Sequence, residues 1–176
     1  MRRGILLCLL AAAPAAAPAE VVAAGPNGFE VRHVVQIVVP QPIAFGAFTQ
    51  ISQWWNAEHT YSGKSSNLTL SLSPGGCFCE ALDNGGGIEH LHVAYVAPGE
   101  RLVMTGALGP LLYQAATGVM DIRVERIAGG SRVTLDYKVA GFANGGAEKL
   151  APQVDQMLGD QMARYRKYAV AMPRSS

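Results

Sequence analysis

The fold of this chain can be inferred from residues 150–169, LAPQVDQMLGDQMARYRKYA, which have the periodicity of one long helix. Their apolar members recur every three or four positions, so they share one side of a helix. These members are Leu150, Val154, Met157, Leu158, Met162, Tyr165 and Ala169. Charged residues such as Asp160 and Lys167 lie largely elsewhere. A helix of this kind must bury its apolar side against another layer of structure.

The residues before this helix predict that layer, a series of antiparallel strands. Residues 29–39 alternate as in a half-buried strand, and Pro40 ends the run. A short helix is expected from Pro42 to the tryptophan pair. Further strands are expected, separated by glycine-rich turns, at 68–72, 77–82, 88–96, 101–108, 118–127 and 132–139. We therefore predict an α+β fold in which a curved antiparallel sheet wraps around the C-terminal helix, with a short helix after the first strand.

The composition excludes several classes of protein. The chain has 176 residues, is 49% hydrophobic and carries a net charge of +1. A nucleic-acid-binding domain would need a basic stripe, and a disordered chain would be less hydrophobic. Three cysteines are too few for a disulfide scaffold. Charged residues make up 15%, against about 25% in typical domains, which fits uncharged glycine-rich turns.

The first 19 residues have the features of a secretory signal peptide. Arg2 and Arg3 precede an apolar run at residues 5–13, and Ala17-Pro18-Ala19 has the small-x-small pattern of a cleavage site. We expect cleavage near Ala19, or as late as residue 24, because Ala23 and Ala24 offer a second site. The apolar run is shorter than the about 20 residues of a membrane span. A periplasmic or secreted protein without a stable membrane span is therefore expected.

The expected domain organisation follows from these segments. Residues 20–28 are expected to form a flexible N-terminus, and residues 29–171 a single domain. Residues 172–176 are expected to be a disordered tail. Nothing in the sequence distinguishes a monomer from a homodimer.

The order of elements, together with local motifs, resembles the START-like or SRPBCC superfamily over residues 29–168. The motifs are Trp54-Trp55, His59-Thr60-Tyr61-Ser62-Gly63, Gly75-Gly76-Cys77-Phe78-Cys79-Glu80, Glu89-His90, Gly106-Ala107-Leu108-Gly109-Pro110-Leu111, Val154-Asp155 and Gln161. The most similar branch is related to the activator of Hsp90 ATPase and to polyketide cyclases. The resemblance implies a helix-grip fold that holds a small hydrophobic molecule between the sheet and the last helix. The chain has no phosphate-binding glycine loop followed by lysine, so we do not predict an ATPase.

An aromatic and polar cluster follows the expected first helix. The cluster consists of Trp54, Trp55, His59 and Tyr61, which suit a rim over a cavity mouth, with His59 as a proton acceptor or hydrogen-bond donor. The alternative is a packing cluster in which His59 caps nearby backbone carbonyls. Both interpretations remain open at this stage.

A second candidate pair lies on the hairpin of residues 77–96. With the turn centred near Gly85, Glu80 pairs with His90, and both share a face with His92. The carboxylate could orient the imidazole for acid–base chemistry, or the two could be an ordinary cross-strand polar pair. A one-residue slip would instead set Cys77 and Cys79 opposite His92 and His90, as in a zinc site. We predict no metal, because the short turn that usually wraps ligands around zinc is absent.

Cys77 and Cys79 also raise the question of a disulfide. Alternate residues of a regular strand lie about 6.6–6.8 Å apart, the upper limit of disulfide Cα spacing, so a bond would need a bulge. Buried reduced thiols are the favoured interpretation.

The leading functional hypothesis is an exported protein that binds a small hydrophobic or amphipathic ligand without a cofactor. The expected ligand contacts are Trp55, Tyr61, Met104, Tyr113, Tyr137 and Met157. Residues 106–114 are expected to form a gating loop or a hydrophobic connection. The alternatives are a cyclase, dehydratase or hydrolase that uses His59 or the Glu80–His90 pair, and a co-chaperone-like interaction module.

Overall fold

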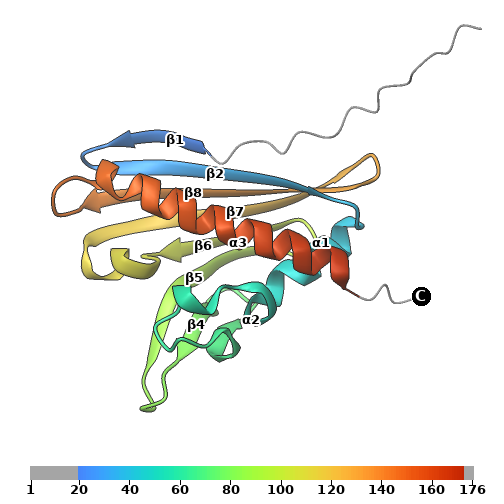
Figure 1. The fold of residues 1–176 in the computed structure, drawn as a ribbon, viewed down its shortest axis with the longest axis horizontal. Coiled ribbons are helices and arrows are strands. Elements are labelled where there is room, and N and C mark those ends of the chain that lie inside the picture. The colour runs from blue at the N-terminus through green and yellow to red at the C-terminus, as the bar shows by residue number, and fades with distance from the viewer. Residues whose placement is uncertain (1–19, 173–176) are drawn as a thin grey trace, which may run out of the picture.

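A computed structural model describes residues 20–172 and shows an antiparallel sheet with one long helix on its inner face (Figure 1). The strands are β1 (Glu20–Gly25), β2 (Gly28–Ile37), β3 (Leu68–Leu70), β4 (Cys77–Ala81), β5 (Gly87–Ala97), β6 (Arg101–Gly106), β7 (Ala115–Ile127) and β8 (Gly130–Phe142). Their order in the single sheet is β1-β2-β8-β7-β6-β5-β4-β3, and all neighbours are antiparallel. The α+β fold class expected from the sequence is confirmed.

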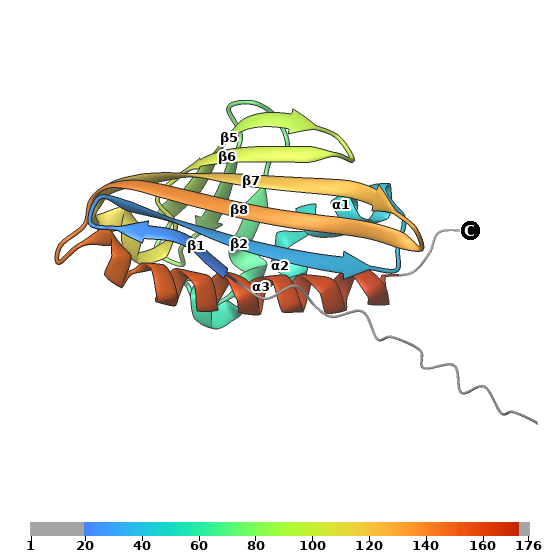
Figure 2. The same ribbon diagram turned by 90° about the horizontal axis from the view of Figure 1, so that it is seen from above.

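Helix α3 (Ala151–Ala171) forms the second layer and runs along the sheet, as Figure 2 shows from above. Its buried residues include Val154, Leu158, Met162 and Tyr165, which are the apolar positions of the predicted stripe. Tyr165 donates a hydrogen bond of 2.8 Å from its hydroxyl to the carbonyl oxygen of Ala44. Together with Tyr137 of β8, these side chains fill the space between the helix and the middle of the sheet.

Short helices close one end of the sheet. The predicted first helix is two pieces, α1 (Gln41–Thr49) and α2 (Ile51–Trp54), and the 3-10 turns η1 (Ala57–His59) and η2 (Ser65–Asn67) follow. Trp54 ties the two pieces together, because its indole donates to the carbonyl oxygen of Ala47 over 3.1 Å. Two more 3-10 turns are η3 (Gly109–Tyr113), between β6 and β7, and η4 (Ala147–Lys149), before α3.

The N-terminal part of the described chain differs from the expectation. Residues 20–28 were expected to be flexible, but Glu20–Gly25 form β1, which pairs with β2. The sequence EVVAAG has no clean alternation, and the strand forms because the edge of β2 offers it backbone partners. The predicted signal peptide, and the tail beyond Met172, lie outside the described residues. No helix within residues 20–172 is long and apolar enough to cross a membrane.

The ladder between β4 and β5 contains an irregularity at His90. Phe78 pairs with Leu91, but Cys79 pairs with Glu89, so β5 holds one residue more than β4 at this point. Our predicted pairing of Glu80 with His90 is therefore wrong, since Glu80 lies opposite Ile88. As in a β-bulge, the extra residue changes which side the next side chains face. His90 and Leu91 are consequently both buried, whereas His92 is exposed and does not share their face.

The same irregular ladder accommodates a disulfide between Cys77 and Cys79. Their Cα atoms lie 5.4 Å apart, well within the range for a disulfide and shorter than the spacing in a regular strand. The prediction of reduced thiols is wrong, because it assumed a regular strand.

Candidate ligand-binding site

A pocket of about 390 Å³ lies between the segment that follows α2 and the η3 segment. It is bordered by the segment after α2, by the η3 segment, by His90 of β5 and by Met157 of α3. Most of its surface is apolar. Its lining residues are Trp55, Glu58, His59, Thr60, Tyr61, His90, Leu108, Gly109, Pro110, Tyr113 and Met157.

A buried carboxylate holds His90 in place at this pocket. The His90 Nε2 atom lies 2.9 Å from Glu80 Oε2, and neither side chain is more than 4% exposed. Glu80 also accepts hydrogen bonds from the backbone N–H groups of Tyr61 and Ser62, so the loop after η1 encloses the carboxylate. The bulge makes this arrangement, because it turns His90 to the inner face on which Glu80 already lies.

The protonation of the pair follows from these contacts. Burial by itself would raise the pKa of Glu80, but the hydrogen bonds from Ser62, Tyr61 and His90 outweigh it and lower the pKa. Burial lowers the pKa of His90 and outweighs the opposing effect of Glu80. An ionised carboxylate only accepts hydrogen bonds, so the neutral imidazole carries its proton on Nε2. The Nδ1 atom of His90 is then a bare acceptor, and it has no partner among the described residues.

His59, on the opposite wall, is held through a buried glutamine. Gln161 of α3 accepts a hydrogen bond from the Asn56 backbone N–H at its Oε1 atom, over 2.9 Å. Its amide nitrogen therefore faces His59 and donates to Nδ1 over 2.7 Å. Neutral His59 consequently carries its proton on Nε2. The His59 ring is exposed, and the Trp55 indole donates to its carbonyl oxygen over 3.0 Å.

Two tyrosines secure the η3 wall of the pocket. The hydroxyl of Tyr61 donates to the carbonyl oxygen of Gly109 over 2.9 Å. The hydroxyl of Tyr137 accepts from the N–H of Leu108 and donates to the carbonyl oxygen of Gly106. Tyr113, at the outer edge, is 74% exposed, which leaves its ring available to cover a bound molecule.

The structure brings most of the predicted site residues together. Trp55, His59, Tyr61, His90, Tyr113 and Met157 all line the pocket. Glu80 lies behind His90, while Met104 and Tyr137, expected as ligand contacts, are buried in the filled core and do not line it. Gln161 was not predicted to have a role in the site. A polar residue between Leu158 and Tyr165 of the apolar stripe was the signal that could have identified it.

Several solved structures are similar to this chain in architecture. Ara h 8.0201 superposes with a TM-score of 0.56 at 11% identity, covering 82% of this chain and 99% of that one. The protein Mll3558 from Rhizobium loti gives 0.61 at 14% identity, with 80% and 96% covered. DynU16, a protein of the dynemicin biosynthetic locus, gives 0.58 at 18% identity, and the match covers 81% of this chain and 47% of DynU16. The chain has the helix-grip fold.

These identities show a shared helix-grip fold and nothing finer. No protein-family model and no curated protein matches the chain. Function must therefore be argued from the pocket itself.

Proposed function

We propose that this helix-grip domain binds a small, mostly apolar molecule that carries a hydrogen-bond donor. The observation that carries the proposal is the buried, unpartnered Nδ1 atom of His90, a residue that lines an otherwise apolar pocket. A buried polar atom without a partner costs free energy, and a ligand donor would relieve that cost. DynU16, which shares the fold, comes from the dynemicin biosynthetic locus, and this association supports a small-molecule role.

The two histidines offer complementary groups to such a ligand. His90 presents an acceptor whose proton is held on the other nitrogen by Glu80. His59 presents an N–H donor, because Gln161 occupies its Nδ1 atom. Apolar contact with Trp55, Tyr113 and Met157 would supply affinity at about 25 cal/mol per Å² of buried surface, before the costs of association.

The test uses 1-anilinonaphthalene-8-sulfonate, an amphipathic probe with one N–H donor. Fluorescence titration should show saturable binding to the wild-type protein and at least about tenfold weaker binding to His90→Phe, which keeps a ring but loses the acceptor. Val119→Thr, an exposed position on β7 that does not line the pocket, is the matched control. Equal affinities for wild-type protein and His90→Phe would refute the proposal.

A second candidate function is general-base catalysis in the same pocket. The specific observation in its favour is that the Glu80 carboxylate holds one nitrogen of His90 and leaves the other nitrogen unprotonated. In this arrangement Glu80 orients His90 and stabilises the imidazolium that forms when His90 accepts a proton. Hydrolysis of 4-nitrophenyl butyrate tests it, with water losing a proton to His90 as it attacks the ester carbonyl. Turnover above the buffer rate that disappears in His90→Phe supports catalysis. An unchanged rate in that variant eliminates it.

We also propose that the protein is exported and cleaved after Ala19. A cut near residue 24 would remove most of β1 (Glu20–Gly25), which pairs with β2, whereas a cut after Ala19 keeps these residues. The disulfide suits an oxidising compartment. Cell fractionation followed by N-terminal sequencing should find a mature chain that starts at Glu20 outside the cytoplasm. A chain that retains Met1–Ala19 would contradict the proposal.

A further inference from the structure

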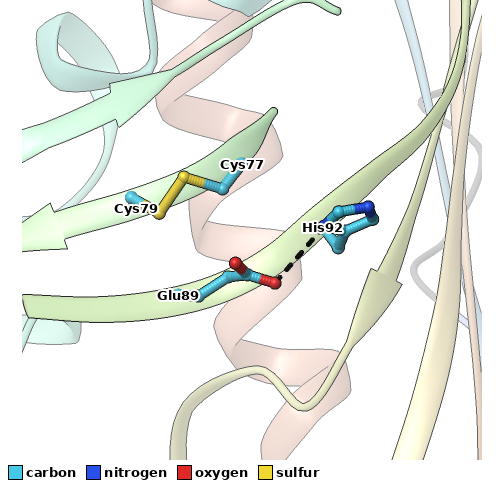
Figure 3. Close-up of a disulfide and its surroundings, with 4 residues drawn as sticks. All are labelled: Cys77, Cys79, Glu89 and His92. Carbon is cyan, nitrogen blue, oxygen red and sulfur yellow. Dashed lines mark ion pairs between the residues drawn. A yellow bond between two sulfur atoms is a disulfide. The ribbon is translucent and has the colours of Figure 1, made fainter. Parts of the chain in front are cut away.

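The disulfide lies on the side of the β4–β5 hairpin that faces away from α3, with Glu89 and His92 beside it (Figure 3). The Glu80–His90 pair lies on the inner face of the same hairpin. Cys77 is paired with His92, and Cys79 with Glu89. The side chains of Glu89 and His92 are 56% and 46% exposed, so this group of four residues is reachable from solvent.

The disulfide contributes little to holding the fold together. It closes a loop with one intervening residue, and the entropy that a disulfide removes from the unfolded chain grows with loop length. Both cysteines belong to β4, so the bond links no two elements of structure. Reduction should therefore leave the fold intact and release two thiols on one face of a strand.

Three of the side chains, Cys77, Cys79 and Glu89, already lie close enough together to share one metal ion, and His92 lies beside Glu89. The two Sγ atoms and one Glu89 carboxylate oxygen all lie within 4.8 Å of one another. His92 Nδ1 lies 3.6 Å from Glu89 Oε1. Around zinc, with bonds of about 2.0–2.3 Å, ligand atoms are about 3.3–3.8 Å apart. Reduction would let the two sulfur atoms separate to this spacing, and the exposed His92 side chain would have to rotate toward them to complete the site.

We propose that Cys77, Cys79, Glu89 and His92 form a metal site for Zn²⁺ or a similar ion, and that the disulfide is its oxidised form, which cannot bind metal. Two thiolates and an imidazole favour zinc over magnesium or calcium, which prefer oxygen ligands. The site lies across the sheet from the pocket and does not depend on the function proposed for it.

The switch between the two forms is a balanced thiol–disulfide exchange. A dithiol reductant gives two electrons and two protons, the Cys77–Cys79 bond breaks, and the reductant becomes a disulfide. A divalent ion then displaces the two thiol protons, which leave to solvent, and two metal–sulfur bonds form. Reoxidation of the cysteines would expel the metal.

The experiment is a titration with Co²⁺, a spectroscopic substitute for zinc, under anaerobic conditions. Full-length protein reduced with a phosphine and freed of reductant should bind one Co²⁺ per chain, with thiolate-to-cobalt absorption that Zn²⁺ abolishes by displacement. Protein that retains the disulfide should bind at least about a hundredfold more weakly, because its sulfurs cannot serve as thiolate ligands. Failure of the reduced protein to develop thiolate absorption would overturn the proposal.

Variants separate the four-residue site from two free thiols acting alone. In reduced protein, Glu89→Gln and His92→Ala should each weaken binding at least about tenfold, and Cys77→Ser should abolish the absorption. Glu125→Gln, an exposed glutamate on β7, is the matched control and should leave affinity unchanged. Wild-type affinity in a Glu89→Gln/His92→Ala double variant would refute the assignment. Circular dichroism of each reduced variant establishes that it is folded.

Discussion

Two histidines of the sheet are buried beside carboxylates, and the two pairs are built differently. His90 and His33 are each only 4% exposed. Glu80 accepts a hydrogen bond from His90 and two more from backbone N–H groups. Asp155 of α3 has its Oδ1 atom 3.0 Å from His33 Nε2, but the two atoms are not aligned for a hydrogen bond and neither has another partner.

The difference shows which contacts make a buried histidine–carboxylate pair suitable for acid–base chemistry. The backbone of residues 61 and 62 fixes the Glu80 carboxylate, which fixes the imidazole through Nε2 and leaves the Nδ1 atom of His90 without a partner. The His33–Asp155 pair lies between β2 and α3, away from the pocket lining, and joins the two layers only by its electrostatic attraction. Both histidines are buried beside a carboxylate, but only the Glu80 carboxylate is held in place by additional hydrogen-bond donors.

Removing the organised carboxylate should have the largest effect. Glu80→Ala would leave three donors without their acceptor, the buried His90 among them, and should lower the free energy of unfolding by about 3–5 kcal/mol, measured by urea denaturation. Asp83→Ala, which removes an exposed carboxylate paired with Lys64, should cost at most about 1 kcal/mol. Similar losses in the two variants would mean that the loop contacts of Glu80 are not important for stability.

Removing the second carboxylate should have a much smaller effect. Asp155 makes no aligned hydrogen bond to His33 and its side chain is 20% exposed, so Asp155→Ala should cost about 1 kcal/mol or less in the same assay. A loss as large as that of Glu80→Ala would show that the two pairs are equivalent in solution.

The smallest expected effect is a pH dependence that arises from His33. Burial lowers its pKa below the ordinary 6.5, against the opposing attraction of Asp155, the charged group that faces it. The unfolded chain therefore gains a proton at higher pH than the folded chain, and the His33 contribution is complete above about pH 6.5 and is lost as pH falls. His33→Phe should show a shallower loss of stability than wild type between about pH 7 and pH 5. An identical pH dependence in both proteins would contradict this assignment.

The regular parts of the molecule could be predicted from sequence, and the irregular parts could not. The stripe from Val154 to Ala169 and the alternation from Phe29 to Ile37 follow from periodicity, so α3 and β2 were expected almost as observed. Glu80 and His90 were expected on one face and are in contact, although through the wrong register. The position of a bulge depends on which register gives the best contacts between the two strands as a whole. No residue type within residues 77–92 indicates where β5 takes up its extra residue.

The remaining differences have the same kind of cause. The disulfide depends on the irregular ladder, so it could not be deduced from the spacing of a regular strand. Met104 and Tyr137 were expected at the ligand, but both are enclosed in the core. How closely a helix approaches a sheet depends on the fit of many side chains at once, which local periodicity does not contain.

The double hydrogen bond of Tyr137 has a consequence for how this domain can change over evolutionary time. The Tyr137 hydroxyl is hydrogen-bonded to the backbone of both Gly106 and Leu108, the residues on either side of Ala107. These contacts lie where β6 ends, just before the η3 segment. Insertions or substitutions beyond Leu108 can then reshape the pocket wall without altering the strands that Tyr137 stabilises. A single anchoring tyrosine of this kind would let one scaffold acquire new ligand preferences through its loop alone.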